Sequence, residues 1–308
     1  MKILLTGSRG LVGSNIVNYS LASNHEILAP SSAQLNLLDF DSVSSYIGVH
    51  QPEMVIHAAG IVGGIQANIS RPVQFLVDNM QMGLNILMVS KEARVKRFMN
   101  LSASCMYPRD AQNPFSEDLI LKGQLEPTNE GFALAKIAIT RLCEYINRED
   151  TSFLYKTVIP CNLYGKYDKF DPEHSHMIPA VIRKLHEAKS QALDFVNIWG
   201  DGLARREFLY ASDFADFVYY AIDHFANMPQ NINVGLGHDY SINEYYQKIA
   251  DVVGYQGKLI HDLSKPVGMQ QKLIDDTRLR EFGWQHKTTL EQGIQSTYDY
   301  FLNEVYRD

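Results

Sequence analysis

The sequence predicts an α/β fold, in which a doubly wound parallel sheet is followed by a smaller C-terminal α/β lobe. A short apolar run at 2–6 leads into a glycine-rich turn, and apolar residues at helical spacing follow that turn. The segment 54–60 is apolar almost throughout, which is typical of a parallel strand covered on both faces. Strand and helix patterns then alternate as far as Gly165, and this alternation predicts parallel βαβ units.

The glycine-rich turn has the spacing Gly-x-x-Gly-x-x-Gly and lies between a strand and a helix. In that context the first two glycines let the backbone approach a pyrophosphate, and the third lets the helix pack closely on the strand. The phosphates then bind at the N-terminus of the helix. The turn therefore predicts a Rossmann-like dinucleotide site rather than an ordinary tight turn. The residues expected in this site are Gly7, Arg9, Gly10, Leu11, Val12 and Gly13.

The end of the second strand, at 26–29, indicates which dinucleotide binds. The strand ends in Pro-Ser-Ser-Ala and lacks the acidic residue that usually binds the ribose hydroxyls of NAD. Ser31 and Ser32, together with Arg9, are placed to accept a 2′-phosphate instead. NADP(H) is therefore the expected cofactor, and a polar turn beside an exposed arginine is the alternative.

Four further residues of this half have expected roles. Asp39 is expected to cap the helix that follows it, with a contact to adenine as the less favoured role. Ala58 and Ala59 end the third strand, and their small side chains let the cofactor lie against the backbone. His57 is expected to be buried and hydrogen-bonded rather than catalytic.

The chain divides into a nucleotide-binding domain at 1–165, to which 205–235 returns, and a substrate lobe at 166–204 and 236–308. One helix in the returning segment is expected to be capped near Ser212-Asp213. The other expected elements are helices after Pro72, at 131–148 and at 178–188, and strands at 97–101, 157–160, 196–200 and 232–235.

The bulk composition excludes several classes of protein. A net charge of −7 and a pI near 5.8 argue against nucleic acid or an anionic membrane as the main partner. The three cysteines, Cys105, Cys143 and Cys161, lack the spacing of a zinc site or a disulfide framework, so no metal is expected. No apolar run is long enough to span a bilayer, and a cytoplasmic protein is expected.

Two segments carry the candidate chemistry: Leu-Ser-Ala-Ser-Cys-Met-Tyr-Pro at 101–108, and Asn-Glu-Gly-Phe-Ala-Leu-Ala-Lys at 129–136. Their layout resembles the active site of a short-chain dehydrogenase/reductase. That family has a serine four residues before the tyrosine of the first segment and a second tyrosine four residues before the lysine. Ala103 and Phe132 occupy those two positions here, while Lys136 is present.

Further motifs extend the resemblance over nearly the whole chain. The sequence is similar to the extended short-chain dehydrogenase/reductases of the GDP-L-fucose synthase type, which are GDP-4-keto-6-deoxymannose 3,5-epimerase–4-reductases. The most specific motifs are Glu-Pro-Thr-Asn-Glu at 126–130 and Ser-His-Met-Ile-Pro-Ala at 175–180. Others are Ser-Cys-Met-Tyr-Pro at 104–108, Asn-Leu-Tyr-Gly at 162–165, Arg-Glu-Phe-Leu at 206–209 and Lys-Leu-Ile-Asp at 272–275.

The resemblance implies a role for each matching residue. A 4-keto group acidifies the hydrogens on carbons 3 and 5, so epimerisation needs a base and an acid, which the resemblance places on Cys105 and His176. Lys136 anchors the nicotinamide ribose. The residues that correspond to substrate-binding positions are Asn162, His176, Arg183, Trp199, Arg206 and Lys272. The family forms homodimers through two helices per subunit, here those after Pro72 and after Gly131.

The substitutions at 103 and 132 predict an impaired reduction, because neither side chain can donate a proton to the oxygen on carbon 4. Three interpretations remain open. The substitutions are engineered; or the enzyme has diverged, with water, Tyr107 or Lys136 covering the donor role; or the protein binds NADP and sugar nucleotide as a silent module. A related enzyme that makes GDP-L-colitose is the closest catalytic alternative.

Overall fold

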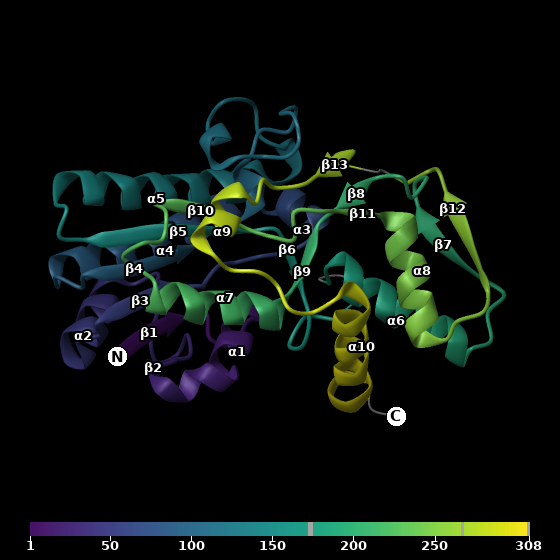
Figure 1. Ribbon diagram of the computed structural model, residues 1–308, viewed down its shortest axis with the longest axis horizontal. Coiled ribbons are helices and arrows are strands. Elements are labelled where there is room, and N and C mark those ends of the chain that lie inside the picture. Colours follow the sequence, from purple (N-terminus) through teal and green to yellow (C-terminus); the bar gives the residue numbers. More distant parts are fainter. Residues whose placement is uncertain (172–174, 266–267, 307–308) are drawn as a thin grey trace.

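A six-stranded parallel sheet forms the centre of the larger lobe in the computed structural model, which describes residues 1–171, 175–265 and 268–306 (Figure 1). The strand order is β10-β5-β4-β3-β1-β2. From β1 the chain passes first to β2 on one side and then to β3 on the other, which makes a topological switch point between β1 and β3. The strands are β1 (Lys2–Thr6), β2 (Glu26–Leu28), β3 (Met54–His57), β4 (Arg97–Leu101), β5 (Leu154–Pro160) and β10 (Asn231–Val234).

Helices cover both faces of this sheet (Figure 1). Side chains alternate along the strands, so Leu4 and Val55 enter the core on one face while Ile3 and Ile56 enter the core on the other. The predicted doubly wound α/β fold is thereby confirmed. The first face is covered by α2 (Phe40–His50), α4 (Pro72–Glu92) and α5 (Glu130–Glu149), and the second by α1 (Leu11–Val17) and α7 (Ala211–Asp223).

Two helix starts were predicted from capping residues, with different outcomes. The Asp39 carboxylate accepts hydrogen bonds from the backbone N–H groups of Asp41 and Ser42 at 3.0 and 3.3 Å, which confirms the cap of α2. The cap predicted near Ser212-Asp213 is wrong, because α7 begins at Ala211 without a side-chain cap. The Asp213 carboxylate instead accepts hydrogen bonds from the backbone of a distant segment near Thr288, at 2.8 Å from its N–H.

The smaller lobe packs three helices around its own core (Figure 1). These are α6 (Met177–Ser190), α8 (Ile242–Val253) and α10 (Leu290–Tyr300), and a π-helical turn at Phe301–Val305 follows the last of them. A two-stranded parallel sheet of β7 (Phe195–Trp199) and β12 (Lys258–Asp262) lies at the outer end of this lobe. None of the helices in the described part of the chain is long and apolar enough to cross a membrane.

Short strands join the two lobes. β6 (Asn162–Tyr164) pairs with β9 (Phe208–Tyr210), and β8 (Arg205–Arg206) pairs with both β11 (Tyr240–Ser241) and β13 (Gln271–Lys272). Two short α-helices are α3 (Ile65–Ser70) and α9 (Thr277–Phe282), and 3₁₀ turns lie at Ser20–Asn24, Ser104–Met106, Glu117–Leu119 and Pro127–Asn129.

The cores of the two lobes are interleaved along the chain. Ile274, Leu279 and Trp284 lie within the segment expected in the smaller lobe, yet they pack in the core beside the central sheet. The chain then returns to the smaller core with Leu290 and Ile294. The smaller lobe is therefore interrupted once more than the sequence division at 236–308 implied.

Candidate active site

The glycine turn after β1 forms a backbone cradle at the switch point of the sheet. Gly7 has φ +71°, and a Cβ at this position would lie 2.6 Å from the backbone nitrogen of Ala59. A Cβ on Gly13 would lie 2.2 Å from the Gly7 carbonyl oxygen, so only glycine lets α1 pack against the turn. The N-terminus of α1, at Gly10, has no side-chain cap, which leaves its N–H groups for an anionic ligand.

The residues expected to select the cofactor have different surroundings. Arg9 and Ser32 are exposed and line the same cavity as the glycines. Ser31 also lines it, but its hydroxyl donates to Gln34 Oε1 at 3.0 Å. Asp39 caps α2 and does not line the cavity.

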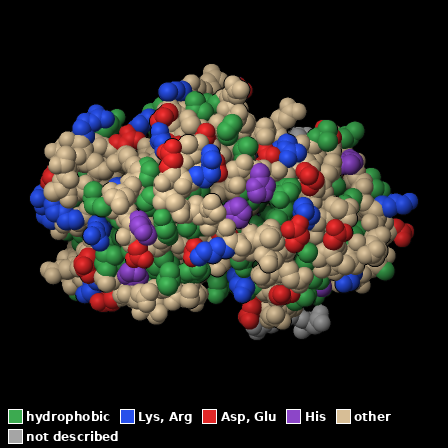
Figure 2. Space-filling model, in the orientation of Figure 1, with side chains coloured by type: hydrophobic (Ala, Val, Ile, Leu, Met, Phe, Trp, Pro, Cys, Tyr) green, Lys and Arg blue, Asp and Glu red, His purple; other side chains and the backbone are tan. Residues whose placement is uncertain are grey.

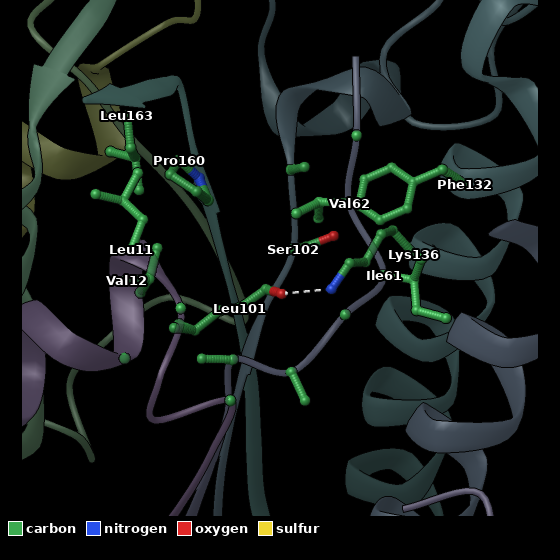
Figure 3. A pocket seen from close by; sticks show the side chains of 18 of the residues that line it. Leu11, Val12, Ile61, Val62, Leu101, Ser102, Phe132, Lys136, Pro160 and Leu163 are labelled. Atoms are coloured by element: carbon green, nitrogen blue, oxygen red, sulfur yellow. Dashed lines mark hydrogen bonds between the residues drawn. The ribbon is translucent and has the colours of Figure 1, made fainter. Parts of the chain in front are cut away.

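The cavity has a volume of about 810 Å³ and extends from the glycine turn to the short strands that join the lobes. Leu11 and Val12 line it from α1, and Phe132 and Lys136 line it from α5 (Figure 3). Ala58 and Ala59 belong to the same lining. His57 does not; it is buried, and its Nδ1 lies 2.9 Å from Thr6 Oγ1, which confirms the expected structural role. Burial lowers the pKa of His57 to about 3.

Ala103, Phe132 and Lys136 all line this cavity, and Phe132 and Lys136 lie one turn apart on α5. Neither Ala103 nor Phe132 brings a hydroxyl group into it. Lys136 Nζ donates a hydrogen bond to the Leu101 carbonyl oxygen at 3.0 Å and lies 5.6 Å from the centroid of the Phe132 ring (Figure 3). Burial lowers the pKa of Lys136 to about 8, so this ammonium group gives up a proton more readily than an exposed lysine.

Tyr107 is not available as a substitute proton donor. Its side chain is only 2% exposed, and its hydroxyl donates a hydrogen bond to Asn233 Oδ1 at 2.5 Å. Asn233 is fixed in turn, because its amide nitrogen donates to the Phe115 carbonyl oxygen at 2.9 Å. Tyr107 is also absent from the cavity lining. The hypothesis that Tyr107 covers the missing donor role is therefore wrong.

Cys105 and His176 both line the cavity. Burial raises the pKa of the Cys105 thiol, while the positive charges of Lys272 and Lys136 act in the opposite direction. His176 stands at the N-cap position of α6, and its Nδ1 lies 3.4 Å from Asp168 Oδ1. The hydrogen bond to Asp168 raises the pKa of His176, which favours the protonated ring.

Arg206 and Lys272 stand side by side on β8 and β13, where they are paired in register. Both line the cavity, and burial lowers the pKa of each. Asn162, on β6, lines it as well, and its amide nitrogen donates to the Glu207 carbonyl oxygen at 2.9 Å. Three of the expected substrate residues thus converge on one wall.

Arg183 and Trp199 do not line this cavity. Arg183 Nε donates to Glu187 Oε1 at 2.6 Å within α6. Trp199 is 61% exposed at the end of β7, where Lys265 Nζ lies 5.7 Å from the centroid of its ring. The structure brings the other expected substrate residues together without these two.

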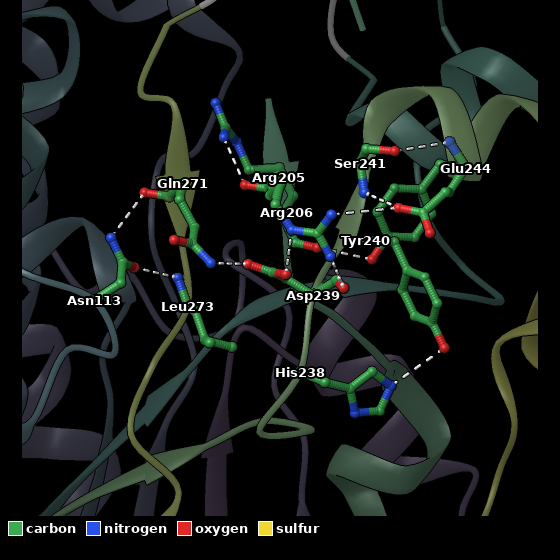
Figure 4. Close-up of polar contacts among 11 residues, drawn as sticks. Asn113, Arg205, Arg206, His238, Asp239, Tyr240, Ser241, Glu244, Gln271 and Leu273 are labelled. Carbon is green, nitrogen blue, oxygen red and sulfur yellow. Dashed lines mark hydrogen bonds and ion pairs between the residues drawn. The ribbon is translucent and has the colours of Figure 1, made fainter. Parts of the chain in front are cut away.

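A polar network holds the strands that carry the cationic pair (Figure 4). Arg205 Nε donates to Asp239 Oδ1 at 2.7 Å, and Gln271 Nε2 donates to Asp239 Oδ2 at 2.6 Å. Asn113 Oδ1 accepts from the Leu273 N–H at 2.8 Å on the far side of β13. The strands β8 and β13 are thereby tied to the segment before β11 and to the loop around Asn113.

Two residues of the site, Asp168 and Asn129, were not predicted from the sequence. Asp168 has a buried side chain, and its Oδ2 has no hydrogen-bond partner among the described residues. Asn129 lines the cavity near Phe132, and its buried Oδ1 likewise has no partner within the described part of the chain. Asn129 lies in the Glu-Pro-Thr-Asn-Glu motif, which was a usable signal, whereas no local pattern marks Asp168.

Comparisons with known proteins agree with this geometry. Residues 3–235 match the model of the NAD dependent epimerase/dehydratase family. The GDP-L-colitose synthase of Yersinia pseudotuberculosis is 58% identical over 308 residues, which is 100% of both chains. The GDP-L-fucose synthase of Escherichia coli is 40% identical over 310 residues, covering 98% of this chain and 96% of the relative.

Solved structures extend the likeness to three dimensions. The GDP-mannoheptose C4 reductase from Campylobacter jejuni with NADP bound superposes with a TM-score of 0.88 at 29% identity, covering 98% of each chain. The GDP-L-fucose synthetase from Naegleria fowleri bound to NADP has a TM-score of 0.88 at 26% identity, covering 97% of this chain and 93% of that structure. With the cradle, the lysine of the active site and full-length relatives in agreement, the chain belongs to the NAD dependent epimerase/dehydratase family, the extended short-chain dehydrogenase/reductases.

Proposed function

We propose that this enzyme uses NADP(H) and acts on a GDP-linked 4-keto-6-deoxy sugar, which it epimerises readily and reduces slowly. The observation that supports this most directly is the composition of one cavity. It combines the glycine cradle, the Lys136 ammonium group, the Cys105 and His176 pair and the cationic pair Arg206 and Lys272. The likeness to GDP-L-colitose and GDP-L-fucose synthases supports the same substrate class.

The cradle fits a dinucleotide because glycine at positions 7 and 13 lets the turn pack closely against Ala59 and α1, and the uncapped N-terminus of α1 then lies at the cavity. The α1 N-terminus would hold the pyrophosphate, Arg9 and Ser32 the 2′-phosphate, and Lys136 the nicotinamide ribose. When bound, NADPH supplies the hydride for reduction of the keto group.

Epimerisation falls to Cys105 and His176. A base removes the hydrogen next to the keto group, and an acid returns a proton to the opposite face of the same carbon. The hydrogen bond that His176 donates to Asp168 raises the pKa of the imidazole and favours its protonated form, so His176 is suited to be the acid. Cys105 is then the base: burial raises the pKa of its thiol, and the nearby charges of Lys272 and Lys136 offset part of that rise.

Reduction needs a proton for the oxygen on carbon 4, and Lys136 is placed to give it. Its Nζ lies beside the ring that replaces the family tyrosine, and burial brings its pKa to about 8. A water molecule is the competing proton source. The variant Lys136→Arg separates the two sources, because arginine keeps the positive charge and does not release protons near neutral pH. Reduction that survives in Lys136→Arg indicates water as the donor.

Solvent deuterium exchange, followed together with NADPH oxidation, tests the proposed function. The enzyme is incubated in D₂O with a GDP-4-keto-6-deoxy sugar. The expected result is fast incorporation of deuterium with slow oxidation of NADPH. Fast oxidation refutes the impaired reduction, and binding without either process indicates a silent binding module. Cys105→Ser should abolish exchange, and exchange that persists in this variant refutes the assignment of the base.

The same assay distinguishes two substrates. The GDP-L-colitose pathway substrate has a methylene at carbon 3, so only carbon 5 has a configuration to invert. The relative that is 58% identical favours this 3-deoxy sugar. Faster turnover of the 3-deoxy compound than of its 3-hydroxy counterpart supports a colitose-type enzyme, and the reverse preference supports a fucose-type enzyme.

The proposed assembly is a homodimer through α4 and α5. Val73 and Val77 lie one turn apart on α4 and are 72% and 53% exposed, and Leu134 and Tyr145 on α5 are 38% and 48% exposed. Paired α4 and α5 helices from two copies would cover these side chains in a four-helix bundle. Light scattering should give twice the chain mass, and Val77→Asp should give the single-chain mass.

We further infer a cytoplasmic location, which the substrate class and the three free, buried cysteines support.

Acidic and basic side chains are interspersed over the face shown in Figure 2, which fits a small-molecule enzyme better than a protein that binds nucleic acid.

A further inference from the structure

Glu207 is a buried carboxylate behind the cationic wall of the cavity. Its side chain is 0% exposed. One carboxylate oxygen, Oε1, accepts hydrogen bonds from the backbone N–H groups of Leu236 and Gly237 at 2.5 and 3.0 Å. The other, Oε2, accepts from the Ile274 N–H at 3.1 Å. A single side chain thus satisfies three backbone groups that come from two distant parts of the sequence.

The three N–H groups belong to segments that determine where the cationic pair lies. Leu236 and Gly237 follow β10, the edge strand of the central sheet. Ile274 lies two residues after Lys272 on β13. Glu207 itself directly follows Arg206. The carboxylate therefore connects the central sheet to both of the strands that present cations to the cavity.

The fit around this carboxylate is tight. A Cβ on Gly235 would lie 2.3 Å from Glu207 Oε1, so only glycine fits there. The Glu207 carbonyl oxygen accepts from Asn162 Nδ2 at 2.9 Å, and the Arg206 carbonyl oxygen accepts from the Tyr245 hydroxyl at 3.0 Å. The network of Arg205 and Asp239 holds the same strands as well (Figure 4). Each of these contacts fixes the backbone on which a cavity-lining side chain stands.

A buried carboxylate is costly unless it is hydrogen-bonded, and here the three backbone N–H groups offset that cost. Burial raises the pKa of Glu207 to about 7, which shows how strongly the site resists the negative charge. The three N–H donors act in the opposite direction and stabilise the charged form. None of the three donor residues belongs to the glycine turn. The carboxylate is therefore expected to affect binding of the sugar nucleotide and not binding of the cofactor.

We infer that Glu207 is the positioning residue for the phosphate-binding pair Arg206 and Lys272, and that its three backbone hydrogen bonds set the separation at which the two cations meet a diphosphate. This inference rests on the proposed function, because it takes the ligand of the pair to be the GDP diphosphate. Two neighbouring cations repel each other, and a fixed backbone keeps both directed at one anion before it binds.

Binding of GDP and of NADP⁺ to the wild-type protein and to Glu207→Gln, measured by calorimetry, tests the inference. Glutamine keeps the size of the side chain, but its NH₂ group faces one of the backbone N–H groups and cannot accept from it. GDP should bind at least about tenfold more weakly, and NADP⁺ should bind within about twofold of the wild type. The sign is informative, because loss of negative charge near Lys272 would by itself strengthen the binding of an anion.

Glu117→Gln is the matched control. Glu117 is also a buried glutamate, 4% exposed, and it accepts from the Asn233 N–H at 2.8 Å without lining the cavity. This variant should lose stability while its affinity for GDP stays unchanged. An equal loss of GDP affinity in both variants refutes the inference, because general loosening would then explain it.

The remaining outcomes are equally decisive. Unchanged or tighter GDP binding in Glu207→Gln refutes the inference alone, and so does a parallel loss of NADP⁺ binding. A wild-type protein that does not bind GDP refutes the proposed substrate, and the inference falls with it. If Glu207→Gln does not fold, Glu207→Asp is judged by the same criteria; if neither variant folds, Glu207 serves overall stability and the inference is refuted.

Discussion

The sharpest prediction is a gain of function when the two missing hydroxyl groups are restored together, in the variant Phe132→Tyr with Ala103→Ser. Phe132 and Ala103 are only partly buried and both line the cavity, so the added hydroxyls enter open space rather than a packed core. The new phenol stands beside Lys136 Nζ, which lies 5.6 Å from the centroid of the present ring. A nearby ammonium group lowers the pKa of a phenol and prepares it for proton transfer.

The size of the expected gain follows from the two groups restored. A positioned general acid typically contributes roughly 10²–10⁴ in rate. A hydroxyl that stabilises the developing oxyanion contributes about 10²–10³. Because both groups act on one oxygen, the gains do not multiply, and we expect an increase of about 10²–10⁴ in the rate of reduction. Phe132→Tyr alone should give most of it.

The measurement is NADPH oxidation with the 4-keto sugar nucleotide, followed beside deuterium exchange in the same samples. Exchange passes through an enolate whose charge develops on the same oxygen, so its rate should rise as well, but by less than that of reduction, because Cys105 and His176 carry out the proton transfers at carbon. An unchanged reduction rate in a variant that still binds both ligands would show that the missing hydroxyls do not limit reduction. A wild-type rate already within about tenfold of the double variant would refute the reasoning as well.

Three further changes have defined outcomes. Asp168→Asn removes the carboxylate that raises the pKa of His176, so the exchange rate should begin to fall at a lower pH than in the wild type. A pH profile of exchange checks this, and an unchanged profile refutes the pairing of Asp168 with His176. Gly13→Ala places a Cβ 2.2 Å from a carbonyl oxygen of the glycine turn and should cost roughly 1–3 kcal/mol in stability with weaker NADP⁺ binding, as followed by thermal shifts with and without NADP⁺. Asp213→Asn disturbs a carboxylate that accepts from the Thr288 N–H at 2.8 Å and should cost roughly 1–3 kcal/mol in urea unfolding, with GDP and NADP⁺ affinities unchanged.

The fold of the larger lobe could be predicted because its signals are local. The continuous apolar run at β3, the glycine turn before α1 and the cap at Asp39 each act over a few residues, and the structure contains them at those places. The cap of α7 could not be predicted in the same way. Asp213 has the right residue type at the right position, but a backbone segment more than seventy residues away takes its hydrogen bonds.

Site residues could be predicted where sequence spacing determines their position, and could not be predicted where the orientation of a side chain determines its contacts. Phe132 and Lys136 are one helical turn apart, so they had to share a face of α5. Tyr107 belongs to the same segment as Cys105, yet its hydroxyl points into the core and donates to Asn233. Sequence spacing alone does not predict the direction of this side chain. Asp168 lies on a loop, and its contact with His176 depends on the path of that loop. The path is determined by the packing of the whole lobe.

The interleaving of the two cores has a consequence for how this enzyme can evolve and be engineered. The chain leaves the core beside the central sheet after Cys161, returns to it with Leu209, and returns again with Ile274, contributing to the smaller core in between. Neither core is built from one continuous stretch, so heat should melt both in a single cooperative transition. The smaller lobe therefore cannot be exchanged between relatives as one continuous segment, because several parts of the chain would have to be replaced together. Sugar specificity is more readily changed by point substitutions along the cavity wall.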